Sequence, residues 1–201
     1  MTKHIQFFIS LSILPLALGA CSSGASRSEA SAAAPAAAQP VSMAGRATFE
    51  GLSFTLPASW KLETPSSSMR LAQYRVSSGG ESEDGECAVF HFPGTGGSVR
   101  ANLDRWYGQF QQPGGGNTAD LAKVEKFEAG GFLVTQVDVS GTYTGSTGPM
   151  GGGGEPMPGY RMVAGVVETP QGPWFLKCTG PEQVMASAVP EVRALLETVG
   201  P

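Results

Sequence analysis

Short runs in which apolar and polar residues alternate occupy much of the chain from residue 46 onward, and this pattern predicts β-strands. The clearest run is 69–76, MRLAQYRV, whose successive side chains would point to opposite faces of a strand. Turn residues separate neighbouring runs at Gly130-Gly131 and between Pro170 and Pro173, as in hairpins. About seven strands are predicted, over residues 47–56, 69–76, 87–92, 121–128, 132–143, 160–169 and 174–179. Because most of them follow one another as hairpins, we expect a mostly antiparallel sheet.

Two other segments have the spacing of amphipathic helices. Ser98–Gln112 carries one apolar stripe, formed by Val99, Leu103, Trp106 and Phe110. Trp106 is therefore expected to pack in the core, with Arg105 at the border of the stripe. A second helix is predicted over Pro181–Val199, divided at Pro190 because proline removes a helical hydrogen bond. A sheet with two main helices packed on it is an α+β fold.

The first twenty residues have the pattern of a secretory signal. Lys3 supplies a positive charge, the segment Ile5–Leu18 is largely apolar, and the small residues Gly19 and Ala20 follow it. The apolar stretch is shorter than the roughly 20 residues that span a bilayer as a helix. We therefore expect residues 1–20 to be a signal peptide.

The end of this signal, Leu18-Gly19-Ala20-Cys21, resembles the lipobox of bacterial lipoproteins, in which an aliphatic and two small residues precede a cysteine. The resemblance implies cleavage between Ala20 and Cys21 and the attachment of acyl chains such as palmitate to Cys21. Several chains on one residue would hold the protein stably on a membrane. The alternatives are an ordinary secretory signal with a coincidental cysteine, and an uncleaved anchor.

A lipid anchor implies a location on the cell membrane or the outer membrane, facing the periplasm or the exterior. Ser22 follows the cysteine where an aspartate would favour retention, so the resemblance favours the outer membrane in a cell that has one. Residues 21–45 are rich in Ala, Ser and Pro and have too few bulky apolar groups to fold. They predict a disordered tether with a mean reach of about 25–30 Å. The folded domain is then residues 46–201.

The amino-acid composition bears on which classes of partner the protein is expected to bind. The 201 residues carry a formal net charge of -4, and charged residues make up 15% of the chain. Nucleic-acid binding is not expected, because it would require a basic surface. The 28 glycines and 15 prolines suit strands joined by turns.

Four segments of the domain are similar to a group of bacterial envelope proteins that in turn resemble the PsbP-type fold of extrinsic photosystem proteins. The segments are GLSFTLPASW (51–60), MRLAQYRV (69–76), GGSVRANLDRWYGQF (96–110) and GPWFLKCTGP (172–181). The resemblance covers most of residues 46–200. It implies an antiparallel sheet covered by helices, in a protein that acts as an assembly or binding module. No functional residue of that fold maps onto this chain, and no photosynthetic function follows.

Catalytic motifs are scarce. Neither the G-x-S-x-G nucleophile elbow nor the zinc motif H-E-x-x-H occurs, and we expect no cofactor. His91 is the only histidine outside the leader, so any histidine-based mechanism would need it. A strand histidine is commonly a packing residue. A hydrolase that assembles a site around His91 from distant residues is nevertheless the alternative to a binding module.

Acidic residues crowd into ESEDGE, where Glu81, Glu83, Asp84 and Glu86 lie close together in sequence. Oxygen ligands at this density could hold Ca²⁺, but the EF-hand spacing is missing. The alternative is a solvated acidic loop.

Cys87 and Cys178 remain once Cys21 is acylated, and both fall in predicted strands. In an oxidising compartment they can form a disulfide. That bond would close a loop of about 90 residues and stabilise the domain by roughly 4–5 kcal/mol in the chain-entropy model. The alternative is a pair of buried free thiols.

The segment Gly145–Gly159 is rich in glycine but has no Lys-Ser/Thr after it, which excludes a phosphate-binding P-loop. It predicts a long mobile loop with Met150 and Met157 near its tip. The sequence as a whole thus predicts a lipid-anchored, non-enzymatic envelope protein whose domain binds a partner protein or a small ligand.

Overall fold

The structure is a computed structural model that describes residues 45–80, 82–145 and 155–201, together with the backbone of 41–43. The predicted signal peptide, the lipobox and most of the predicted tether lie outside these residues. Within the described ranges, every helix falls short of the length and apolar content that a membrane crossing requires.

The described residues form eleven strands and three helices. In chain order they are β1 (Val41–Met43), β2 (Arg46–Phe49), β3 (Leu52–Thr55), β4 (Lys61–Glu63), β5 (Ala72–Val76), β6 (Gly85–His91), α1 (Val99–Tyr107), β7 (Phe110–Gln111), α2 (Thr118–Leu121), β8 (Lys123–Ala129), β9 (Phe132–Tyr143), β10 (Met157–Thr169), β11 (Gly172–Pro181) and α3 (Glu182–Glu197).

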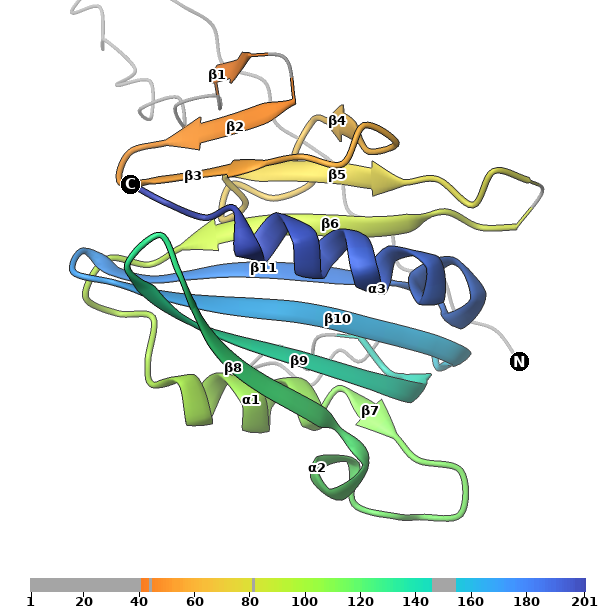
Figure 1. Cartoon of the computed structure of the whole chain (residues 1–201). Helices are drawn as coiled ribbons and strands as arrows, with labels where there is room; N and C mark the ends of the chain where they lie inside the picture. The colour runs from red at the N-terminus through yellow and green to blue at the C-terminus, as the bar shows by residue number, and fades with distance from the viewer. Residues whose placement is uncertain (1–40, 44, 81, 146–154) are drawn as a thin grey trace, which may run out of the picture. The chain divides into compact units, whose positions relative to one another are not determined.

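Eight of the strands form one antiparallel sheet (Figure 1). Seven of them follow one another in the order β4-β5-β6-β11-β10-β9-β7, and the eighth, β8, pairs with β9. The strands β1, β2 and β3 form a second, smaller antiparallel sheet. The predicted α+β class with a mostly antiparallel sheet is therefore confirmed. The segment that forms β1 lies in the range assigned to the tether.

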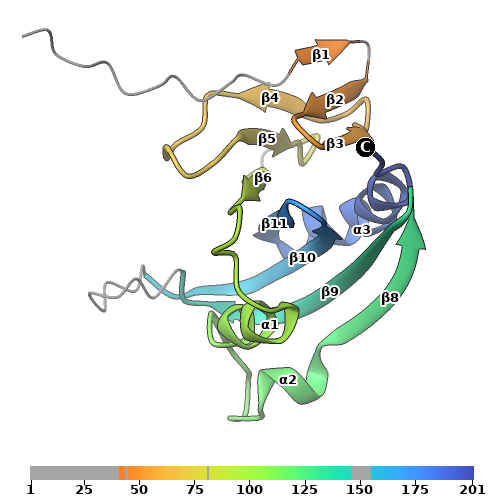
Figure 2. The same cartoon turned by 90° about the vertical axis from the view of Figure 1, so that its left-hand side faces the viewer.

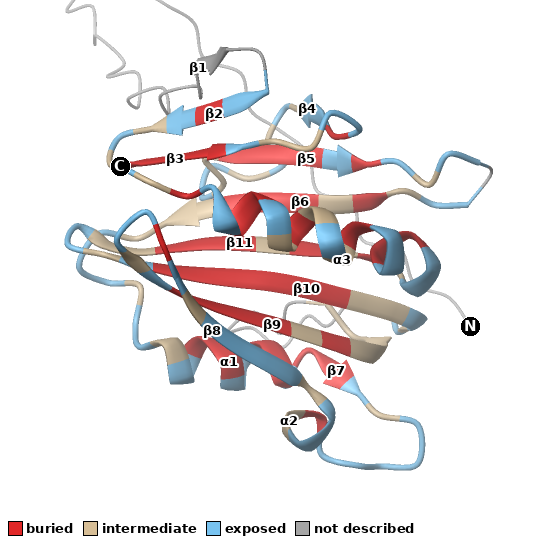
Figure 3. Cartoon of the chain, in the orientation of Figure 1, coloured by how far each residue is buried: buried red, intermediate tan, exposed pale blue. Residues whose placement is uncertain are grey.

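The helix α3 covers one face of the large sheet and buries the larger core cluster against it (Figures 1 and 3). Met185, Val192 and Leu196 are almost completely buried on its inner side. Gly165, in the middle of β10, allows this close approach: a Cβ there would lie 2.6 Å from a methyl carbon of Leu196.

The helix α1 packs on the opposite face of the sheet (Figure 2). Leu103, Trp106 and Tyr107 bury its apolar side in a second core cluster, with Val137 of β9 and Ala164 of β10. The side of α1 nearest to β6 and β11 does not close over those strands, and the site described below lies there.

Two predicted boundaries were wrong because tertiary pairing overrides the local pattern. The run 47–56 is a hairpin and not one strand, since the chain turns at Glu50-Gly51, where Gly51 has a φ of 83°. The first helix ends at Tyr107 and not at Gln112. Phe110 still joins the apolar cluster of α1, but it does so from β7, whose backbone pairs with Tyr143 of β9.

Pro190 does not divide the second helix, which is continuous over Glu182–Glu197. Pro190 is exposed, so its ring and the hydrogen bond that it removes lie on the solvent side of the helix, where the unpaired backbone carbonyl does not have to be buried. Met157 was expected near a loop tip but begins β10. Met150 lies outside the described residues.

Candidate ligand-binding site

A pocket of about 440 Å³ opens on the face of the sheet that carries α1. Its floor consists of side chains that alternate along β6 and β11 and lie opposite one another in register: Phe90 faces Phe175, and Ala88 faces Lys177. Trp106 of α1 forms one wall. Its volume is in the range of about 300–1,000 Å³ that is typical of small-molecule sites.

Aromatic rings give the pocket its apolar surface. The ring centroids of Phe90 and Phe92 are 6.2 Å apart with nearly parallel planes, and Phe92 lies 6.1 Å from Phe175. The ring of Trp106 meets that of Phe175 edge to face at 6.2 Å. Trp106 and Phe175 are each only 3% exposed, so packing holds these rings in place.

Lys177 projects into the pocket from the middle of β11. Its Nζ donates hydrogen bonds to Oε1 of Gln109 at 2.6 Å and to the hydroxyl oxygen of Tyr143 at 3.1 Å. It also lies 5.2 Å from the centroid of the Tyr143 ring, a cation–π distance. Its cross-strand neighbours on both sides, Ala88 and Ala164, are small and leave space beside the ammonium group.

The charge on Lys177 has no carboxylate partner: none of the ion pairs among the described side chains includes it. Burial lowers the pKa of Lys177 to about 8, and the positive charges of Arg70 and Arg105 contribute to this shift. Burial also raises the pKa of Tyr143, so that phenol stays neutral beside it.

Two arginines complete the charged side of the pocket. Arg70 donates from Nη1 to Oε1 of Gln73 at 2.7 Å and forms an ion pair with Glu86 at 2.7 Å. Arg105 is exposed on α1 and donates to Oδ1 of Asn102. With Lys177, the pocket has three cationic side chains and one carboxylate, which leaves a formal charge of two positive units.

His91 lies on the other face of the sheet, away from this pocket. Its ring stacks on the ring of Trp174, its cross-strand neighbour, with centroids 4.1 Å apart and planes inclined by 6°. Its Nε2 is buried and accepts no hydrogen bond from the described residues. Burial lowers the pKa of His91. The described structure brings neither a hydroxyl nucleophile nor a carboxylate into hydrogen-bonding contact with this imidazole.

The acidic residues considered as candidate Ca²⁺ ligands have separate partners. Glu83 accepts a hydrogen bond from the Tyr160 hydroxyl at 2.7 Å, Asp84 accepts one from the Ser78 backbone N–H at 2.7 Å, and Glu86 pairs with Arg70. Glu81 lies outside the described residues. Among the residues that the structure does describe, no group of three or more His, Cys, Asp or Glu side chains could hold one metal ion.

Cys87 and Cys178 lie directly opposite each other in β6 and β11, and their sulfur atoms lie within bonding distance. Both side chains are completely buried on the α3 face. A disulfide between them would link the two strands that form the floor of the pocket, immediately behind Ala88 and Lys177.

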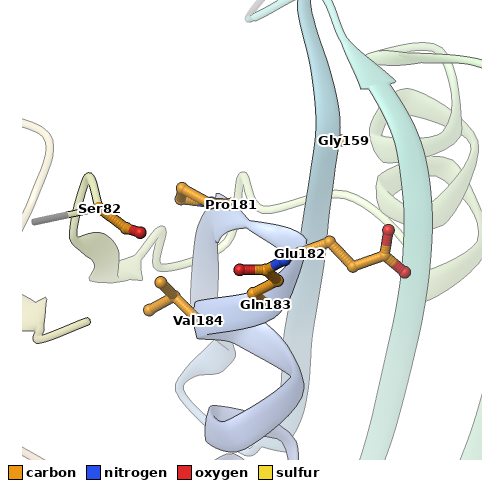
Figure 4. A pocket seen from close by; sticks show the side chains of 6 residues that line it. All are labelled: Ser82, Gly159, Pro181, Glu182, Gln183 and Val184. Atoms are coloured by element: carbon orange, nitrogen blue, oxygen red, sulfur yellow. The ribbon is translucent and has the colours of Figure 1, made fainter. Parts of the chain in front are cut away.

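A second hollow, of about 310 Å³, lies at the start of α3, where Ser82 and Gly159 meet Pro181–Val184 (Figure 4). Figure 4 shows that Glu182 points away from Ser82, and its carboxylate accepts a hydrogen bond from the Ser140 hydroxyl. The polar side chains among the described residues that line this hollow, Ser82, Glu182 and Gln183, are all exposed, so none is held in place by burial. The aromatic pocket therefore has the stronger features of a binding site.

The sequence interpretation placed Trp106 in the core with Arg105 at its border, and it missed Arg70, Gln109, Tyr143 and Lys177 as site residues. One signal for the site was present in the sequence. Lys177 interrupts the apolar run Trp174–Cys178, and a single cation in a strand predicted to be buried needs an explanation. The partners of Lys177 come from distant parts of the chain and have no such signal.

Comparisons with known proteins give similarities of structure alone. No protein-family model and no curated protein sequence matches the chain. The protein of unknown function PA94 from Pseudomonas aeruginosa matches with a TM-score of 0.45 and 10% identity, over 74% of this chain and 90% of that one. LpqN of Mycobacterium tuberculosis, a protein involved in cell envelope biogenesis, has a TM-score of 0.48 and 12% identity, over 74% of this chain and 82% of its own.

The third similar structure is the cyanobacterial PsbP of Synechocystis, with a TM-score of 0.48 and 12% identity. The match covers 79% of this chain and 94% of that one. A PsbP and an envelope-biogenesis protein are therefore both among the structures similar to this chain.

Proposed function

We propose that this protein is a lipid-anchored envelope lipoprotein whose folded domain is a non-enzymatic binding module. In this proposal the domain binds a small ligand in the pocket between α1 and the strands β6 and β11. The observation that carries the proposal is the pocket itself, in which Phe90, Phe92 and Phe175 provide an apolar surface and Lys177 provides a polar anchor.

The pocket is built on elements that are held by contacts of their own. Its floor strands pair directly with each other, and a disulfide between Cys87 and Cys178 would link them from behind. The N-terminus of α1 is capped by Ser98, whose side chain accepts a hydrogen bond from the Ala101 N–H. A preformed site loses less conformational entropy when a ligand binds.

The lipid anchor in this proposal rests on the leader and on Cys21. A tether of about 25–30 Å would hold the domain beside the membrane surface while leaving the pocket accessible. The hydrolase alternative has no comparable support, because His91 packs against Trp174 on the opposite face of the sheet.

Binding is tested with N-phenyl-1-naphthylamine, a neutral dye that fluoresces in apolar sites. The complete chain carrying Cys21→Ser, which cannot be acylated, should bind one dye molecule with a rise in fluorescence. Ala88→Phe places a ring on the floor of the pocket and should weaken binding at least about tenfold, the loss expected when a buried apolar contact is blocked.

Val124→Phe is the matched control, since it adds the same ring on an exposed part of β8 and should leave the affinity unchanged. Circular dichroism and the melting temperature establish that each variant is folded. Absence of dye binding to the folded parent chain, or equal binding by the Ala88→Phe variant, would contradict the proposed site.

A further inference from the structure

The charges of the pocket are unbalanced in a way that the fold does not require. Arg70 has a structural explanation, since it bridges Gln73 and Glu86. Lys177 has no comparable structural explanation, because it forms no ion pair with a described carboxylate. It occupies the middle of a central strand between two alanines, where an apolar residue would pack without the cost of burying a charge.

The hydrogen bonds of Lys177 also leave capacity for a ligand. An ammonium group has three N–H donors, and two of them are accounted for by Gln109 and Tyr143. Both of these partners are neutral acceptors, so they orient the ammonium group without cancelling its charge. None of the described residues accepts a hydrogen bond from the third donor, and the two partners do not cancel the net charge.

We infer that the ligand of this pocket is a small organic anion with an apolar body. Its anionic group lies against Lys177, and its body lies on Phe90, Phe92 and Phe175. Arg105, exposed on α1 at the same pocket, adds attraction for an approaching anion. This inference rests on the proposed function, because it assigns the chemical class of the ligand to the same site.

The inference is tested with three probes that share a ten-carbon chain: decanoate, decanol and decyltrimethylammonium. Calorimetric titration of the complete Cys21→Ser chain should give decanoate an affinity at least about tenfold above that of decanol, since a hydrogen bond to a charged group contributes this much. Decyltrimethylammonium should bind most weakly because the site repels its charge.

Substitutions of Lys177 separate charge from shape. Lys177→Met should reduce the affinity for decanoate at least about tenfold and change that for decanol less than about twofold. Lys177→Arg keeps the charge and should retain the preference for decanoate. Lys126→Met, which removes an exposed cation from β8, is the control and should change neither affinity.

The outcomes separate the two proposals. Equal affinities for decanoate and decanol, or an unchanged decanoate affinity in the Lys177→Met variant, would overturn the anion assignment and leave the pocket as a site for neutral ligands. If no ten-carbon probe binds and the naphthylamine dye also fails to bind, the proposed function itself is wrong.

Discussion

A lysine in the middle of a central β-strand carries a cost that Lys177 does not recover from any ion pair among the described residues. Its two hydrogen-bond partners orient the ammonium group but leave its charge uncompensated. A group held in this way has its pKa lowered, and it reduces stability wherever it remains protonated. The Lys177 side chain is thus both the proposed anchor for a ligand and the source of a loss in stability.

Because the buried charge of Lys177 lowers the stability of the fold but attracts an anion, removing it should raise stability and weaken binding. The pKa of Lys177 is lowered from 10.5 to about 8 in the folded protein, so the unfolded chain holds more protons between these values. The loss of unfolding free energy caused by the protonated Lys177 side chain is complete below about pH 8 and disappears as the pH rises toward 10.5. Lys177→Met should therefore raise the free energy of unfolding by about 1–3 kcal/mol at neutral pH, while it weakens anion binding.

Urea unfolding at about pH 7 and about pH 9.5 measures this difference, and the advantage of the Lys177→Met variant should shrink at the higher pH. Lys126→Met should follow the parent chain at both values, since Lys126 is exposed. A Lys177→Met variant less stable than the parent at neutral pH would show that the ammonium group stabilises the fold, contrary to the argument.

At the scale of elements, β6 and β11 combine two functions. One face of this pair contributes Cys87 and Cys178 to the core beneath α3, and the other contributes Ala88 and Lys177 to the pocket. Because successive side chains of a strand point to opposite faces, a shift of one residue in register would exchange these sets. A disulfide at this position would allow only the observed register, so it would protect the geometry of the pocket as well as the stability of the sheet.

Removal of this bond should therefore affect both properties. The double variant Cys87→Ser, Cys178→Ser is expected to lose about 4–5 kcal/mol of unfolding free energy in the chain-entropy model. Binding of the naphthylamine dye should weaken with it. Mass spectrometry of the non-reduced parent protein after treatment with iodoacetamide measures the bond directly: neither thiol should be alkylated, and alkylation of both would contradict the bond.

The whole molecule combines a folded domain with a leader whose sequence predicts a lipid anchor. The anchor would confine the pocket to the membrane surface, where organic anions with apolar bodies concentrate because of their amphipathic character. This gives the two proposals a common physical setting, although each depends on different residues. In these proposals, Cys21 determines the location and Lys177 determines the class of ligand.

Lipid attachment is predicted to depend on Cys21 alone. Cells supplied with radiolabelled palmitate should incorporate label into the parent chain and into a Ser22→Ala variant, which retains the lipobox cysteine. The Cys21→Ser variant should incorporate none and should no longer fractionate with membranes. Labelling of the Cys21→Ser variant, or its unchanged processing and fractionation, would contradict lipid anchoring at this residue.

Much of the fold was predictable because its signals are local. The alternating run 69–76 predicted a strand, which the structure contains over Ala72–Val76, and the glycine pair at 130–131 predicted the hairpin between β8 and β9. Local signals failed where a distant partner decided the outcome. Phe110 has helical spacing from Trp106, yet pairing with Tyr143 places it in a strand. Pro190 carries a helix-breaking signal, yet the packing of α3 on the sheet maintains the helix through it.

The sequence by itself determined the α+β class and the mostly antiparallel sheet, and it provides the motif on which the expected lipid anchor rests. These depend on spacing within short segments, which the chain order records directly. Only the tertiary structure decided the candidate site. The charged residues of the pocket come from separate segments of the chain, and they surround one pocket because the order and register of the strands bring them together: Arg70, Glu86, Arg105 and Lys177. The placement of His91 against Trp174, on the other face, has the same origin.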